Sequence, residues 1–408
     1  MSLYLMPITI QNRLESMRNR FFIGGDRDDK KMTWVKWKTC LASKAMGGLG
    51  IGSIYGFNVA LLFKWVWRFR NNSNVLWVNV IKEIYGQDGG FGSDRIGKSS
   101  YSPWYSIYHL VSTLRDKGID LLGMCNRSVG NGSTTSFWGD SWCGGRPLKD
   151  QYPRVYALDL NKSCSVADRM GIKDWSSVLR RTPRGGAESN QFADLIQSIQ
   201  QVTLTSSADA WKWELSSSGF SVVSTRQYVD DQTLLGSLSS TRWVRCIPIK
   251  VNVFIWKLRL GKLPTLVNMD RRGIDVDSLL CPICKENVEC VDHLFFLCGM
   301  AKDLWGLLAR WCSLDFPELS STQDWYTWLD ASPMSKCAKI IIEGVAATLM
   351  WSIWNFRNAW IFSMSKPNKA TMWDNIVHQS FLWISSRNPK YNLSWIDWLG
   401  NPINTHTM

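Results

Sequence analysis

The sequence predicts an α+β fold that is predominantly α-helical and multi-domain, with a small structural zinc-binding module. Three observations predict this class. The chain has 408 residues, which is long for one average domain. Most of its apolar segments follow the periodicity of helices rather than that of strands. Residues 281–298 also hold four cysteines and one histidine, and three of those cysteines have, with the histidine, the spacing of metal ligands.

The first segment, residues 1–125, is predicted to be basic and helical. Helices are expected over residues 57–70, with cations towards the C-terminal end, and over residues 75–86 and 102–118. The glycines at 48, 50 and 52 fit neither phosphate-binding loop pattern, so a turn before a helix is favoured.

The second segment, residues 126–210, is predicted to be a linker region with short strands, one of them over Ser136, Phe137 and Trp138. Residues 211–224 alternate around a Ser/Gly turn, which predicts a β-hairpin. A helix over residues 224–235 is expected to follow it.

Helices continue through the rest of the chain. One is expected to begin at Pro248 and end before Pro264, and a short one over residues 266–273 is stopped by Gly273. Another is expected over residues 293–311, packed against the helix at 248–260. Residues 336–386 predict two long helices separated at Lys366 and Pro367. The remaining domains are therefore expected at 211–312, containing the zinc module, and at 313–408, a C-terminal helical region.

Charge favours an anionic partner. The net charge is +13 and the sequence pI about 9.2. Residues 1–70 hold twelve Lys/Arg and four Asp/Glu, which places +8 of that charge there. Nucleic acid is the usual partner of such a chain, although a solvated basic surface would give the same balance. The 24 tryptophans suit stacking surfaces or core packing.

The number of cysteines and the hydropathy of the chain indicate in which cellular compartment the protein is expected. The chain has eleven cysteines, an odd number, and its first residues lack the basic start of a signal peptide. These features predict an intracellular protein. Residues 340–362 are the most apolar stretch, but Glu343 and Arg357 leave a charge-free run of 13 residues, whereas a membrane span needs about 20. A buried helix, and no membrane partner, is expected.

Residues 228–231, Tyr-Val-Asp-Asp, match the metal-binding signature of reverse transcriptases. A polymerase site needs these aspartates on a hairpin between apolar strands, with a third carboxylate to hold two metal ions. Here the flanking residues are polar, and Arg226 is spaced for an i,i+4 pair with Asp230. The candidates for a third carboxylate lie in polar or turn contexts: Asp140, Asp159 and Asp168. The sequence therefore predicts no catalytic residues, and a true polymerase remains the least favoured hypothesis.

The strongest signal is residues 281–298, CPICKENVECVDHLFFLC. Cys281 and Cys284 have C-x2-C spacing, His293 follows after eight residues and Cys298 after four more. Together they make a closed Cys3His set for Zn²⁺, which is structural because no position stays open for a substrate. Cys290 could replace one of the thiolates, and a core of buried cysteines is the alternative.

These residues, with residues 211–231 before them, resemble the reverse-transcriptase zinc-binding domain of plant LINE-type (non-LTR) retrotransposons. The resemblance extends to residues 18–69, which are similar to the segment after the polymerase palm and thumb. It also extends to residues 130–158, which are similar to the linking region.

The resemblance implies a zinc-binding, nucleic-acid-binding C-terminal fragment of such a reverse transcriptase. The implied ligands are Cys281, Cys284, His293 and Cys298, the implied cofactor is structural Zn²⁺, and the implied partner is RNA or DNA. The aspartates of the polymerase palm and the endonuclease domain would lie upstream of residue 1. RNA-directed DNA polymerase activity is therefore not expected of this chain alone. The polymerase part of a related element is a further possible partner, and the nucleus is the implied place of action.

Candidate nucleic-acid contacts are the cations near the metal cluster, each of which could also be ordinary solvated charge: Lys250, Lys257, Arg259, Lys262, Arg271 and Arg272. The alternative function is a structural or protein-interaction zinc module, or a non-functional retroelement remnant. In that alternative Trp351, Trp354 and Trp360 would serve a partner or a core.

Overall fold

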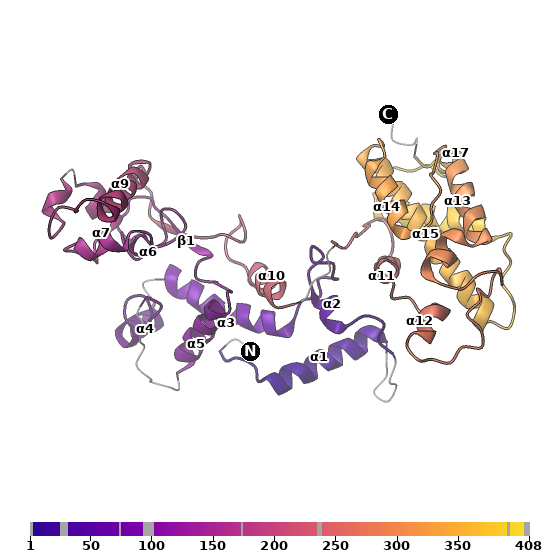
Figure 1. Cartoon of the computed structure of the whole chain (residues 1–408), viewed down its shortest axis with the longest axis horizontal. Coiled ribbons are helices and arrows are strands. Elements are labelled where there is room, and N and C mark those ends of the chain that lie inside the picture. Colours follow the sequence, from indigo (N-terminus) through magenta and orange to yellow (C-terminus); the bar gives the residue numbers. More distant parts are fainter. Residues whose placement is uncertain are drawn as a thin grey trace. The chain divides into compact units, whose positions relative to one another are not determined.

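The computed structural model describes residues 3–24, 32–72, 75–92, 102–172, 174–234, 239–389 and 392–403. Within these ranges helices dominate and the only sheet has two strands, which confirms the predicted α+β, mainly helical class. The chain divides into two compact units (Figure 1). The first contains Met1–Asp29, Cys40–Ser43 and Gly50–Gly236, and the second contains Lys30–Thr39, Lys44–Leu49 and Ser237–Met408. Helix α2 (Trp37–Leu41) contributes residues to both.

The first unit is built around α3 (Ile54–Asn71), the helix predicted at residues 57–70. Ser53 caps it by accepting a hydrogen bond from Gly56 N, and Val59, Phe63 and Val66 are fully buried. The other helices of this part are α1 (Ile8–Ile23), α4 (Leu76–Tyr85), α5 (Pro103–Asp116) and α10 (Val222–Thr233).

The predicted hairpin over residues 211–224 is wrong. Strand β2 (Ala210–Trp213) pairs instead with β1 (Cys125–Ser128), antiparallel, with Cys125 opposite Trp213. The second half of the expected hairpin is taken by α10, because the Ser221 hydroxyl accepts a hydrogen bond from Ser224 N and begins a helix there.

A small core with short helices lies between β1 and β2 in the sequence, around the buried Phe137 and Trp138. The expected strand over Ser136–Trp138 is only a single bridge between Ser136 and Ser165. The side chains of Phe137 and Trp138 are consecutive and both buried, whereas successive side chains of a strand point to opposite faces. The helices are α6 (Leu148–Gln151), α7 (Pro153–Leu158), α8 (Val166–Met170), the 3-10 helix η1 (Trp175–Ser177) and α9 (Ala187–Gln200).

The second unit has its core on α15 (Lys336–Phe362), against which α11 (Ile249–Arg259) and α16 (Met372–Arg387) pack. Pro248 precedes α11, and α15 and α16 are separated around Pro367, as predicted. The remaining helices are α12 (Leu266–Asp270), the π-helical turn η2 (His293–Leu297), α13 (Gly299–Trp311), α14 (Thr322–Ala331) and α17 (Trp395–Gly400).

Helix α15 is long and apolar enough to cross a membrane by length and composition, yet 67% of its most apolar 18-residue window is buried inside the protein. Both of its inner charges are paired, Glu343 with Arg242 and Arg357 with Glu289. Trp354 is buried and Trp351 and Trp360 pack against the same core. The helix has the burial expected of a core helix, and its tryptophans serve that core.

The two units cut across the four segments predicted from the sequence. β2 and α10 belong to the first unit, because β2 pairs with β1 and α10 packs on α3. The metal-cluster segment and α13 share one hydrophobic core with α15 in the second unit. Residues 211–312 are therefore divided between the units, and residues after 313 complete the core beside the cluster.

Candidate metal centre

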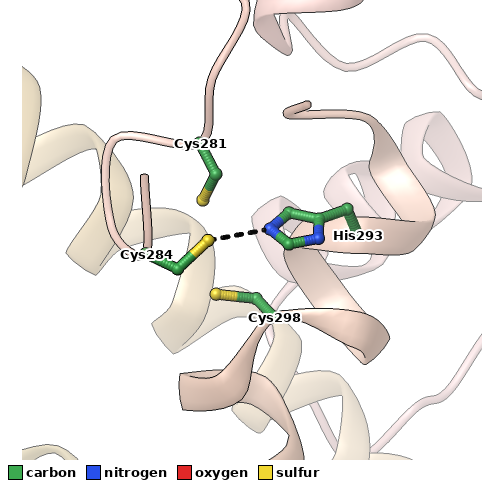
Figure 2. A group of neighbouring side chains, drawn as sticks. All are labelled: Cys281, Cys284, His293 and Cys298. Atoms are coloured by element: carbon green, nitrogen blue, oxygen red, sulfur yellow. Dashed lines mark hydrogen bonds between the residues drawn. The ribbon is translucent and has the colours of Figure 1, made fainter. Parts of the chain in front are cut away.

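The structure brings the four predicted ligands together (Figure 2). Their ligand atoms, three sulfurs and one ring nitrogen, all lie within 4.8 Å of one another, and Cys284 Sγ lies 3.3 Å from His293 Nε2. Tetrahedral Zn²⁺, with bonds of about 2.3 Å to sulfur and about 2.05 Å to nitrogen, separates two sulfurs by about 3.8 Å and sulfur from nitrogen by about 3.6 Å. The residues present fit a zinc ion.

Cys281 and Cys284 lie on a tight turn that closes a small hairpin. Cys281 N donates to Asn287 O at 2.7 Å, Lys285 N donates to Cys281 O at 2.8 Å, and Leu280 bridges to Val288. Lys285 adopts a left-handed φ of 60°, which turns the chain after the second cysteine. The backbone N–H groups of Ile283 and Cys284 donate to the Cys281 sulfur.

His293 and Cys298 come from a π-helical turn. They are five residues apart, which in an α-helix would point their side chains about 140° away from each other. In η2 Cys298 N donates to His293 O at 2.7 Å, an i→i+5 bond, and this wider turn brings both side chains to one side. The expected continuous helix over residues 293–311 is therefore wrong, because the chain breaks at Cys298 before α13 begins.

The protonation of the cluster suits metal binding. Burial lowers the pKa of His293 and so favours the neutral imidazole that can act as a ligand. Cys281 donates a hydrogen bond to Cys298, which raises the pKa of Cys281 and lowers that of Cys298. Met300 N also donates to the Cys298 sulfur at the positive end of α13. Zn²⁺, when bound, would replace the shared proton and hold both sulfurs as thiolates.

Cys290, the alternative ligand, is not part of the cluster. Its Sγ accepts a hydrogen bond from His293 N at 3.3 Å, and it is absent from the described group whose ligand atoms converge. It supports the start of the histidine turn.

A buried ion pair that was not predicted from the sequence anchors the hairpin to α15. Arg357 donates from Nε to Glu289 Oε2 at 3.0 Å and from Nη2 to Oε1 at 2.6 Å, and Leu266 N donates to Oε1 at 3.0 Å. Both charged side chains are buried. The available signal was Arg357 itself, since a cation inside an apolar helix needs a buried partner.

The predicted nucleic-acid contacts differ in how far they are already engaged. Arg272 is exposed but donates to Thr33 O and Trp34 O and stacks over the Trp34 ring at 4.5 Å. Lys250 is exposed and lies 5.8 Å from the Trp351 ring centre. Arg259 is half-buried and lies 5.0 Å from the Tyr326 ring centre.

The other three cations have side chains without a partner among the described residues. Lys262 and Arg271 are exposed and Lys257 is half-buried. Among the residues that the structure describes, none of the three has a side-chain hydrogen bond, ion pair or ring contact. They are available to an external anion.

Asp230 of the Tyr-Val-Asp-Asp stretch has a packing role. It is buried in α10, accepts hydrogen bonds from Ser53 N at 3.0 Å and from the Ser53 hydroxyl, and lies 3.9 Å from Arg226 Nε. The predicted i,i+4 pair is confirmed. The aspartate fixes α10 to the start of α3.

The other carboxylates singled out in the sequence serve local structure. Asp140 accepts from Ser136 N at 2.8 Å, Asp159 is paired with Arg169 inside a core, and Asp168 closes the capping box of α8. In the described part of the chain the one group of three or more ligating side chains is the Cys3His cluster, so no carboxylate triad is assembled there.

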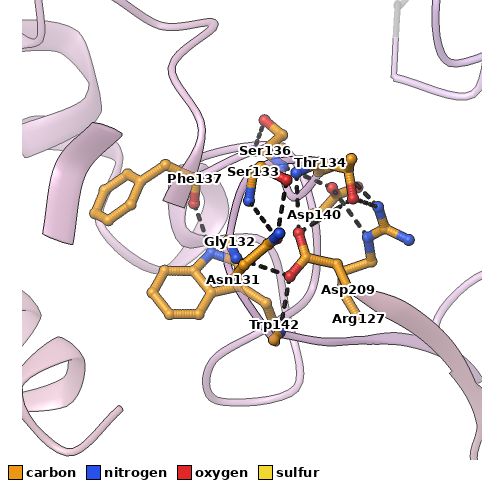
Figure 3. Close-up of polar contacts among 12 residues, drawn as sticks. Arg127, Asn131, Gly132, Ser133, Thr134, Ser136, Phe137, Asp140, Trp142 and Asp209 are labelled. Atoms are coloured by element: carbon orange, nitrogen blue, oxygen red, sulfur yellow. Dashed lines mark hydrogen bonds and ion pairs between the residues drawn. The ribbon is translucent and has the colours of Figure 1, made fainter. Parts of the chain in front are cut away.

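Asp209 is a second anchor that was not predicted from the sequence (Figure 3). Its carboxylate accepts backbone hydrogen bonds from Gly130 at 2.7 Å, Gly132 at 2.8 Å and Thr134 at 2.9 Å. Although burial acts to raise it, these N–H donors hold the pKa of Asp209 well below its usual range. The carboxylate organises the turn that follows β1.

Comparison with known proteins shows what the segment that holds the cluster is similar to. Residues 220–305, which include all four ligands, match the family described as zinc-binding in reverse transcriptase. The chain is also 26% identical over 378 residues to an Arabidopsis thaliana protein described as a ribonuclease H protein, a match that covers 89% of this chain and 58% of that relative. An uncharacterised mitochondrial protein of Arabidopsis thaliana is 27% identical over 144 residues, covering 35% of this chain and 88% of the relative. The chain thus spans little more than half the length of the first relative.

Proposed function

We propose that this chain binds nucleic acid through a surface that a structural zinc ion holds in place, because residues 220–305 match the family described as zinc-binding in reverse transcriptase. We propose further that it derives from a plant LINE-type, non-LTR retrotransposon and acts in the nucleus. The observation that carries the proposal is the convergence of Cys281, Cys284, His293 and Cys298. Four protein ligands close the coordination shell, which supports an organising role for the metal.

Hydrogen bonds connect the hairpin that holds Cys281 and Cys284, here called the zinc hairpin, to the helix that lies between Lys262 and Arg271. Val267 N donates to Glu289 O and Leu266 N to the Glu289 carboxylate, so the hairpin fixes the start of α12. Arg271 follows the end of that helix, and Lys262 precedes it in the sequence. A fixed hairpin therefore presents both cations in a defined position, where they can contact phosphates.

A salt titration tests this surface. We expect the zinc-loaded chain to bind a 20-nucleotide single-stranded RNA, with three phosphate contacts giving a slope of about −2 for log K against log salt. The double variant Lys262→Gln/Arg271→Gln should reduce the magnitude of that slope by about 1.4, because two contacts are lost. Fluorescence anisotropy between 50 and 200 mM KCl, values chosen around the physiological range, measures both.

The matched control is Arg115→Gln/Lys117→Gln, which removes the same charge from exposed positions in the first unit. Equal effects of the two double variants, or binding insensitive to salt, would refute the proposed surface.

A further inference from the structure

The second unit contains a cavity of about 350 Å³, and its lining includes Val291 and Asp292, the two residues that precede His293 in the sequence. Its wall combines the end of α11, residues 239–241, the pair Val291 and Asp292, and the first turn of α14. Its size lies in the range of small-ligand sites. Because Asp292 immediately precedes His293, the metal cluster fixes one side of this wall.

The wall is rich in hydroxyl groups. Thr241 already donates to Gly48 O, and Ser321 caps α14. The side chains of Ser239, Ser240 and Thr322 have no hydrogen bond within the described residues, and they line the cavity. They offer donors and acceptors to a polar ligand.

Among the described residues, Arg259 is the one cation that lines the cavity, whose wall also holds the carboxylate of Asp292. Its Nη1 donates to Ser240 O at 3.2 Å, and none of the ion pairs among the described residues involves it. Arg242, which lies over the same Tyr326 ring, is in contrast paired with Asp330 and Glu343. The N-terminus of α14 is already capped by Ser321, with Asp324 in its first turn, so Arg259 is the anion contact.

We propose that this cavity receives one unstacked nucleotide of a single-stranded nucleic acid. Arg259 contacts its phosphate, and Asp292 and the free hydroxyls contact its sugar or base. The inference rests on the proposed nucleic-acid binding and adds a preference for single strands, since a nucleotide inside a duplex cannot enter a cavity without leaving its stack.

The test compares Arg259→Gln with Arg271→Gln, which removes the same charge from an exposed position outside the cavity. The probes are fluorescein-labelled 12-nucleotide single strands of RNA and of DNA, and the blunt duplex of the same sequence, with the zinc-loaded full chain at one salt concentration. Arg259→Gln should weaken single-strand binding about tenfold and duplex binding less than twofold. Arg271→Gln should weaken both about equally. A larger loss for RNA than for DNA would assign a contact to the ribose 2′-hydroxyl, and equal losses would assign the contacts to phosphate and base.

A second variant, Thr322→Tyr, fills the cavity without changing charge and guards against a folding artefact of Arg259→Gln. We expect the same selective loss of single-strand binding, with zinc content unchanged. If the wild type binds but Arg259→Gln loses no more than Arg271→Gln, or Thr322→Tyr has no effect, the cavity is not the site. If the wild type binds no strand at all, the proposed function itself fails.

Discussion

Asp230 joins two helices that are far apart in the sequence. Its carboxylate receives the backbone N–H and the hydroxyl of Ser53, the residue that caps α3, and lies near Arg226. A buried carboxylate with these partners is an anchor, and a mutation that weakens it leaves buried donors poorly satisfied.

We expect Asp230→Asn to destabilise the chain by about 1–3 kcal/mol, because Ser53 loses a charged acceptor and Arg226 loses its ion-pair partner. Asp231→Asn is the control and should cost less, since one oxygen of the Asp231 carboxylate is buried without a partner in the described structure. Urea unfolding of both variants measures the difference. Magnesium-dependent primer extension by the wild type that disappears in Asp230→Asn would overturn the structural assignment.

For single residues, the sequence spacing predicted partners that lie a few residues apart but not partners that lie far apart in the chain. The four metal ligands and the pair of Arg226 with Asp230 are encoded in short intervals. Glu289 and Arg357, in contrast, are separated by 68 residues, and Asp209 binds a turn 75 to 79 residues away. No periodicity reports a contact across that interval, although a charge in an apolar helix does signal that a partner exists.

The main link between elements in the second unit is the ion pair that ties the zinc hairpin to α15. Glu289 and Arg357 are both almost fully buried, with side chains 0% and 3% exposed. Removing one partner of such a pair leaves a bare charge in a low-dielectric interior. The hairpin is thus held by the metal ligands on one side and by this pair on the other.

Glu289→Gln should destabilise the zinc-loaded chain by about 3–5 kcal/mol, because the Arg357 charge stays buried. Adding Arg357→Met should recover part of that loss. Asp303→Asn, which removes half of an exposed pair with Lys369, is the control and should change stability by less than about 1 kcal/mol. Thermal or urea unfolding measures all three. A cost for Glu289→Gln no larger than that for Asp303→Asn would show that the pair does not anchor the hairpin.

Helix positions were predictable from the sequence because caps and prolines act locally. Pro248 before α11 and the break around Pro367 are examples. The strand that pairs with β2 could not be predicted, because a strand of four residues does not specify which distant strand it pairs with. The π-helical turn at His293 also escaped prediction, since the ligand geometry and not the local propensity favours it.

At the scale of the whole molecule, the zinc centre belongs to one of two units with separate cores. The cluster shares a continuous hydrophobic core with α11, α13, α15 and α16, and the first unit has its own cores around α3 and around Phe137. Metal binding should therefore stabilise the second unit, whose hairpin it closes, and leave the packing of α3 against α10 unaffected.

Zinc stoichiometry of the purified full chain tests the central claim most directly, with the wild type measured beside Cys284→Ser and Cys290→Ser. A closed Cys3His site predicts one zinc per chain in the wild type and in Cys290→Ser, because the wild-type Cys290 sulfur lies outside the cluster and accepts a hydrogen bond from His293 N. It predicts loss of zinc in Cys284→Ser. A folded wild type without zinc, or zinc that depends on Cys290 and survives Cys284→Ser, would contradict the account.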